Sequence, residues 1–243
     1  MDWSNAFNFT FNADFCISFV SIIFINIILS GDNAVVIAMA VRSLQEKQRL
    51  QGIIFGTAIA VVLRIVLTFF AAKLLEVSFL KFCGGALITW IAVKLFIEGS
   101  PEDSGKEVGT IGKAIVTILI ADLVMSVDNV LAVAGACKGN FFLLLFGLGT
   151  SIPLVIFAAG LLSRLMDRYP IIVVIGAMVL GRVGGEMMIG DSFIQRLLGN
   201  PGHFVDYSVQ VVFAVGVVVV GKLWMRRKAR KEAALEASLS AGQ

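Results

Sequence analysis

Histidine is almost absent from this chain, and that scarcity excludes several kinds of chemistry. His203 is the only histidine, and it falls in a predicted loop. The three cysteines, Cys16, Cys83 and Cys137, are widely separated and show neither metal-ligand spacing nor a disulfide pattern. The chain therefore lacks the residues for a Ser/His or Cys/His catalytic pair and for a zinc or copper site, and we do not expect an enzyme.

Charged residues are also scarce. They make up 15% of the chain, and hydrophobic residues make up 58%, whereas soluble domains average roughly 25% charged and 45–50% apolar residues. Too little polar sequence remains to coat a soluble surface. The N-terminus also lacks the positive region of a cleavable signal peptide, so we expect the first apolar run to remain as a membrane span.

Long apolar runs occur seven times, and a helix needs about 20 such residues to cross a bilayer. This predicts an all-α integral membrane protein with seven transmembrane helices, forming one domain over residues 1–225. The basic cytoplasmic tail, residues 226–243, is expected to be disordered. The predicted spans are Phe15–Val41, Gly52–Leu74, Val77–Ile97, Gly112–Ala136, Phe141–Leu162, Ile171–Ile189 and Val205–Lys222.

Lysine and arginine are unevenly distributed between the two sets of connecting segments. If the N-terminus is outside, the outer segments hold only Lys73, Lys81, Lys138 and Arg196, and all other basic loop residues are inside. The positive-inside rule thus predicts a bacterial inner-membrane protein with its N-terminus outside and its C-terminus in the cytoplasm. The basic run Lys222–Lys231 fits a membrane-face anchor, and no nucleic-acid partner is expected.

The chain also repeats itself. The motif Ser30–Asn33 in the first span matches Ser126–Asn129 in the fourth, 96 residues later. The following spans match at an offset of 91 residues; for example, Gly85-Ala86 falls on Gly176-Ala177. Repeat 1 covers about 15–98 and repeat 2 about 112–190, and the extra helix at about 205–222 has no counterpart. Three spans per repeat is an odd number, so the two repeats are predicted to have opposite orientations, as in many secondary transporters.

Both repeat motifs place oxygen-bearing side chains inside predicted spans, where ionisable groups are costly and usually functional. Carboxylate, amide and hydroxyl oxygens suit hard divalent cations such as Mg²⁺, Ca²⁺ and Mn²⁺. The predicted metal ligands are Asn26, Ser30, Asp32 and Asn33 in the first repeat, and Asp122, Ser126, Asp128 and Asn129 in the second.

Helix geometry limits how these side chains can meet. Asp122 and Asp128 are six residues apart, which is roughly 120° around a regular helix. We therefore hypothesise a kink or unwound turn near Ser126–Asn129 that would direct both carboxylates to one cavity. The remaining ionisable residues in spans have structural interpretations: Lys94 as a snorkelling side chain, Arg182 and Glu186 as an i,i+4 pair, and Arg64 as the counter-charge of an aspartate.

At these motifs the sequence resembles the TerC family of membrane proteins, from Phe15 to the seventh span. The most specific parts are Ser30-Gly31-Asp32-Asn33-Ala34 and Ser126-Val127-Asp128-Asn129-Val130. The resemblance implies a seven-helix fold with an inverted repeat, manganese efflux from the cytoplasm, and functional acids at Asp32, Asp122 and Asp128. One departure is Asn26, the repeat mate of Asp122, which is neutral.

The leading prediction is thus a transporter for which Mn²⁺ is the substrate, with no prosthetic group. Residues alone indicate only a hard divalent cation; the choice of manganese follows from the resemblance. Coupling to H⁺ or Na⁺ is an expectation, because clustered carboxylates favour proton uptake. Two alternatives are a Ca²⁺/H⁺ exchanger of the same architecture and a non-transporting membrane scaffold in metal or tellurite stress resistance. The sequence makes no prediction of oligomeric state.

Overall fold

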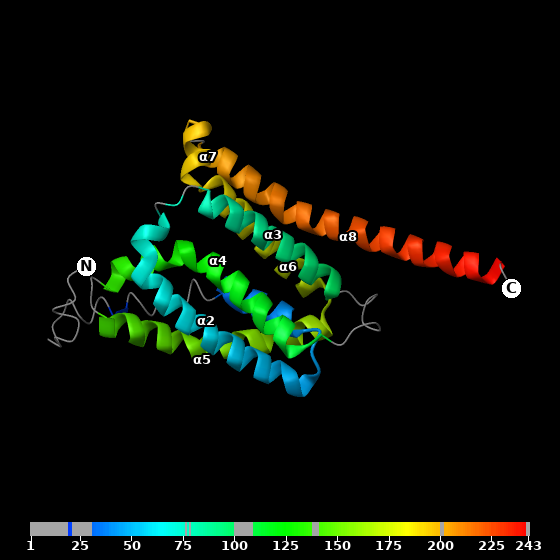
Figure 1. Cartoon of the computed structure of the whole chain (residues 1–243), viewed down its shortest axis with the longest axis horizontal. Helices are drawn as coiled ribbons and strands as arrows, with labels where there is room; N and C mark the ends of the chain where they lie inside the picture. The colour runs from blue at the N-terminus through cyan, green and yellow to red at the C-terminus, as the bar shows by residue number, and fades with distance from the viewer. Residues whose placement is uncertain are drawn as a thin grey trace.

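The computed structural model describes residues 19–20, 31–75, 77, 79–99, 109–137, 141–199 and 202–241, and every regular element within these ranges is a helix. This confirms the predicted all-α class. Asn26 and Ser30 lie outside the described residues. The helices are the segment Gly31–Val41, α2 Glu46–Leu75, α3 Leu80–Glu98, α4 Ile111–Cys137, α5 Phe141–Arg168, α6 Ile171–Ile189, α7 Ser192–Leu197 and α8 His203–Ala241 (Figure 1).

Five of these helices contain stretches that are long and apolar enough to cross a membrane: Glu46–Thr68, Leu80–Glu98, Leu148–Arg168, Ile171–Ile189 and His203–Arg230. Large apolar side chains such as Phe157 and Phe204 are exposed on them, as expected where lipid is the solvent. The chain is therefore a multi-pass membrane protein. α4 has 27 residues, about 40 Å at 1.5 Å per residue, so it is also long enough; the total of seven spans stays a prediction.

The helices form two groups that lie side by side (Figure 1). In one group α2 packs against α4 and α5, and in the other α6 packs against α3 and α8. α3 and α6 approach closely because glycines face each other: a Cβ on Gly85 would clash with the backbone carbonyl of Gly184. Small residues of this kind allow transmembrane helices to pack backbone to backbone. Contacts between α3 and α4 connect the two groups.

Charged residues join several loops at one end of the molecule. Asp167, at the end of α5, pairs with both Arg42 and Arg49, which flank the connection into α2. Arg42 also donates a hydrogen bond to the carbonyl of Gly99, at the end of α3. Three segments that the orientation prediction assigned to the inner face therefore lie at the same end.

A different carboxylate organises the opposite end. Asp191 is buried and accepts hydrogen bonds from the backbone N–H of Phe193 at 2.9 Å and of Phe82 at 3.2 Å. It thus caps α7 and also the first turn of α3, whose own N-cap residue, Phe79, provides no side-chain cap. Neither α7 nor this double cap was predicted from the sequence.

Two further expectations differ from the structure. α4 is helical without interruption from Ile111 to Cys137, so the unwound turn hypothesised near Ser126–Asn129 is absent. α8 does not end near Lys222 but continues to Ala241, through the stretch expected to be a disordered tail, and it projects from the bundle (Figure 1). The extension is rich in alanine, leucine, lysine, arginine and glutamate and contains no glycine or proline before Gly242, a composition that favours a helix.

Candidate metal site

The centre of the candidate site is a buried ion pair between two helices. Asp122 on α4 and Arg64 on α2 are only 8% and 6% exposed, and the guanidinium Nη2 of Arg64 contacts Oδ1 of Asp122. Both positions lie well inside their helices, away from the charged ends. A buried carboxylate without a cation would be costly, so Arg64 provides the compensating charge.

Ser126 closes this pair into a three-residue network. It lies one turn after Asp122 on α4 and is fully buried. Arg64 Nε donates to Ser126 Oγ at 3.0 Å, and Ser126 Oγ donates to Asp122 Oδ2 at 3.2 Å. Thr68 Oγ1 in turn donates to the backbone carbonyl of Arg64 at 2.8 Å. Both carboxylate oxygens of Asp122 are therefore bonded, and the guanidinium is held by two acceptors.

A small cavity lies beside this network. Its volume is about 10 Å³, roughly the space that one water molecule needs. Asn33, which is 4% exposed, reaches it from the segment Gly31–Val41, and Asp122 reaches it from α4. Apolar side chains provide the rest of the wall: Val36, Ile37, Ile118 and Met125. Fold geometry thus brings together Asn33, Asp122 and Ser126 from the two predicted repeats.

Asp32 lies in a different environment from its neighbour Asn33. Consecutive residues in a helix project about 100° apart, and Asp32 is only partly buried. The basic residue whose charge acts on Asp32 is Arg182, on α6. Arg182 also pairs with Glu186 at 3.5 Å and donates from Nε to Gln210 Oε1 at 3.1 Å. The expected Arg182–Glu186 pair is confirmed.

Gln210 changes the interpretation of α8. The sequence predicts the last span only as an extra helix without a counterpart in the repeats, with Gln210 inside it. In the structure this residue is 8% exposed and accepts a hydrogen bond from the arginine that acts on Asp32. A glutamine inside a largely apolar span was the signal, since polar side chains between membrane helices usually bond across to a neighbour.

The other predicted ligands are only partly placed. Asp128 and Asn129 lie in the helical backbone of α4, but their side chains, like Asn26 and Ser30, fall outside the described residues. On an uninterrupted helix, positions 122 and 128 differ by roughly 120° around the axis. Over the described ranges no three His, Cys, Asp or Glu side chains form a group that could hold a metal. The site described is one carboxylate supported by an amide and a hydroxyl.

Comparisons with known proteins agree with the membrane fold. Residues 11–231 match the family described as integral membrane protein TerC family. The uncharacterized membrane protein YjbE of Bacillus subtilis is 42% identical over 214 residues, covering 88% of this chain and 97% of that protein. YceF of the same organism, also described as an uncharacterized membrane protein, is 27% identical over 82% of this chain and 79% of its own length. The inner membrane protein YgdQ of Escherichia coli K12 is 25% identical over 70% of this chain and 78% of its own length. No solved structure shows significant similarity.

Proposed function

The chain belongs to the TerC family of integral membrane proteins, and from this premise we propose that it is an inner-membrane transporter that moves Mn²⁺ out of the cytoplasm. The observation that carries the proposal is the buried carboxylate of Asp122, which faces a small cavity together with Asn33. A cation is the natural ligand of such a cavity, because an anion would meet a carboxylate there. The inner-membrane location is supported by the description of YgdQ.

The donor chemistry supports a hard divalent cation. Asp122, Ser126 and Asn33 offer carboxylate, hydroxyl and amide oxygens, the ligands that Mn²⁺, Mg²⁺ and Ca²⁺ accept. No cysteine or histidine is among the described residues that line the cavity, and the thioether of Met125 is the soft atom in its wall. The cavity, about 10 Å³, is too small for a hydrated ion. The substrate must therefore exchange most of its water for protein oxygens.

Arg64 suggests how binding is coupled to a change in the protein. With no metal bound, its guanidinium neutralises Asp122 and occupies the same oxygens that a cation would need. A divalent cation must displace the guanidinium, and the released Arg64 must then move away from the cation. Cation binding at Asp122 therefore breaks the ion pair between α2 and α4, and a shift of α2 relative to α4 accompanies it.

The remaining predicted ligands complete the proposed path. We place Asp128 and Asn129, with Asp32, Asn26 and Ser30, in further ligand positions that the cation reaches as the two repeats move against each other. The packing of α2 on α5 and of α3 on α6 supports an inverted repeat, because these are the predicted repeat mates. Movement of protons or Na⁺ in the opposite direction would drive export.

The alternatives make different predictions. A Ca²⁺/H⁺ exchanger would use the same site, so the order of metal competition in vesicles distinguishes it from an Mn²⁺ exporter. A non-transporting scaffold would show no flux at all. The hydrogen-bonded Asp122–Arg64–Ser126 network favours transport, since a scaffold has no use for a buried carboxylate beside a cavity.

The test is Mn²⁺ uptake into inside-out membrane vesicles, together with cell-associated manganese during growth in excess Mn²⁺. Asp122→Asn removes a charged ligand, and charge-assisted bonds contribute about 1.5–3 kcal/mol each, so uptake at low Mn²⁺ should fall at least about tenfold. Asp128→Asn should have a comparable effect. Glu186→Gln, which alters a half-exposed acid paired within α6, is the matched control. Asp122→Asn cells that hold no more manganese than wild-type cells, at equal protein levels, would overturn the proposal.

A further inference from the structure

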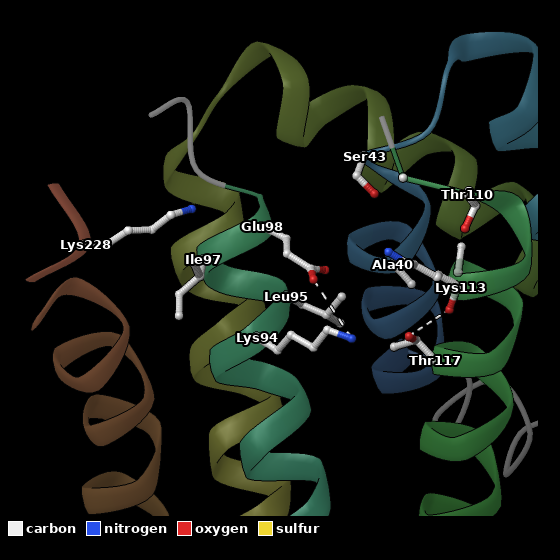
Figure 2. Close-up of a pocket in the computed structure, with 12 residues that line it drawn as sticks. Ala40, Ser43, Lys94, Leu95, Ile97, Glu98, Thr110, Lys113, Thr117 and Lys228 are labelled. Atoms are coloured by element: carbon white, nitrogen blue, oxygen red, sulfur yellow. Dashed lines mark hydrogen bonds and ion pairs between the residues drawn. The ribbon is translucent and has the colours of Figure 1, made fainter. Parts of the chain in front are cut away.

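A large cavity shares no lining residue with the small cavity of the candidate metal site. It has a volume of about 460 Å³, within the range of pockets that hold small molecules or headgroups. Its walls come from the end of α3, the start of α4, the segment Gly31–Val41 with Ser43 after it, and α8 (Figure 2). It lies at the end of the molecule where Arg42 donates to the carbonyl of Gly99, next to the lining residue Glu98.

The lining of this cavity is basic and rich in hydroxyl groups. Lys94 on α3 and Lys113 on α4 both reach into the space between these helices, and Lys228 reaches toward α3 from α8 (Figure 2). The hydroxyl-bearing residues around it are Ser43, Thr110 and Thr117. Lys94 and Lys113, with Lys228 across α3 from them and the hydroxyl groups beside α4, form a set of donors suited to phosphate oxygens (Figure 2).

The start of α4 adds backbone donors to the same wall. Thr110 directly precedes the helix, and its carbonyl accepts the first intrahelical hydrogen bond, from Ala114 N–H at 3.1 Å. The N–H groups of the first turn thus have no acceptor inside the helix, and the helix dipole favours an anion near them. Gly109 N–H donates to the carbonyl of Ser43 at 3.2 Å, which fixes the start of α4 against the segment after Val41.

Aromatic residues place this cavity at the level of the lipid headgroups. Trp90 is exposed one turn before Lys94, whose ammonium lies 5.6 Å from the centre of the Trp90 ring. Trp224 is exposed one turn before Lys228 on α8. Tryptophan gathers at the membrane–water interface, which favours a position for Lys94 and Lys228 just outside the apolar core of the bilayer.

We propose that this cavity is a binding site for a phosphate group, contributed by an anionic phospholipid headgroup or by free phosphate, and held by Lys94, Lys113 and Lys228. Lipid headgroups are recognised by basic pockets between transmembrane helices on the cytoplasmic side, where the positive-inside rule places this end. The site is separate from the Asp122 network, so the proposal goes beyond metal export and does not depend on it.

Glu98 provides a test of whether the ligand of this cavity is an anion. Its carboxylate lines the same cavity and lies 3.9 Å from the ammonium of Lys94. A carboxylate there repels an anion and competes for Lys94. Removing its charge should therefore strengthen phosphate binding, whereas removing a lysine charge should weaken it.

The experiment titrates the purified full-length protein in detergent micelles and follows binding by native mass spectrometry. Phosphatidylglycerol and inorganic phosphate are the two anionic probes, and phosphatidylcholine is the zwitterionic control. The variants are Lys94→Gln, Lys113→Gln, Lys228→Gln and Glu98→Gln, with Lys47→Gln as the matched control because Lys47 is exposed at the same end but does not line the cavity. Each lysine near a membrane surface contributes about 1 kcal/mol, so each cavity variant should bind phosphatidylglycerol about fivefold more weakly.

The results decide both the site and the source of the phosphate. Lysine-dependent binding of phosphatidylglycerol that inorganic phosphate does not displace assigns the site to a lipid headgroup; displacement by inorganic phosphate assigns it to the free anion. Glu98→Gln should tighten binding in either case. Equal binding of phosphatidylcholine, or an equal loss with Lys47→Gln, would overturn the proposal. Melting temperatures of the variants, expected to be unchanged, exclude misfolding as the cause, and Mn²⁺ uptake tests the metal site separately.

Discussion

Arg64 offers the sharpest test of how the buried site works. If its guanidinium occupies the place of the cation at Asp122, then replacing it with a neutral side chain should have two opposite effects. The protein should become less stable without metal, and it should bind Mn²⁺ more tightly. A purely structural arginine would give only the first effect, because its loss would disturb the ligands as well.

The expected sizes follow from the contacts of Arg64. Its side chain and that of Asp122 are 7% and 10% exposed, and removing one partner of such a buried pair costs about 3–5 kcal/mol. For a chain of this length that corresponds to a fall in melting temperature of about 6–20 °C. Mn²⁺ no longer has to displace charge-assisted hydrogen bonds of about 1.5–3 kcal/mol, so Arg64→Gln should raise its affinity about 10- to 150-fold.

The assay compares wild type, Arg64→Gln and Arg64→Lys in detergent at alkaline pH, where protons compete least for the carboxylate. Melting is followed by size exclusion after heating, and Mn²⁺ affinity by the rise in melting temperature with metal concentration. Arg64→Lys keeps the charge but cannot contact both Asp122 and Ser126 as a guanidinium does, so its affinity should lie between the other two. Weaker Mn²⁺ binding in Arg64→Gln, with the protein still folded, would refute the exchange of guanidinium for cation.

Three further predictions concern other parts of the molecule. Arg182→Gln removes the charge that acts on Asp32 and should slow Mn²⁺ uptake several-fold, whereas Glu186→Gln should leave it nearly unchanged; equal rates in vesicles would contradict this role. Asp191→Ala removes the cap of α7 and of α3 and should cost about 1–3 kcal/mol, seen as a lower melting temperature with unchanged uptake per folded molecule. Gly85→Ala places a methyl group against the carbonyl of Gly184 and should cost about 1–3 kcal/mol, whereas Gly160→Ala on α5, which meets nothing within 4 Å, should not lower the melting temperature.

The membrane class and the positions of the helices were predictable because apolar runs determine them. α6, Ile171–Ile189, has the predicted bounds, and it ends at the turn around Gly190 before a buried aspartate. α2 and α5 extend beyond the predicted spans, into Glu46–Gln51 and Ser163–Arg168. These polar turns lie at the charged end of the bundle, so the apolar runs end before the helices do.

The site was predictable as a set of residue types but not as an arrangement. Asp122 and Ser126 are four residues apart, and that spacing alone predicts that they share a helix face. The sequence also named Arg64 as a counter-charge, but only the packing of α2 on α4 selects Asp122 as its partner. Asp32 and Asn33 point in different directions because they are consecutive on a helix, but which neighbouring helix each one faces depends on packing, and no local pattern encodes that.

Arg64 and Arg182 each act on an acid from the other half of the sequence. Asp122 belongs to the second predicted repeat and is neutralised by Arg64 from the first. Asp32 belongs to the first, and the charge that acts on it is Arg182 from the second. In both cases the positive charge comes from the opposite half, and among the described residues Asp122 forms a direct ion pair with its arginine. A cation that binds at Asp122 replaces the ion pair with Arg64, which is a contact between the halves, with a contact inside the site, and so it weakens their attachment where they must move. Because the helix through Asp122 is continuous, this exchange of charge partners, rather than an unwound turn, is the device that links cation binding to rearrangement in our proposal.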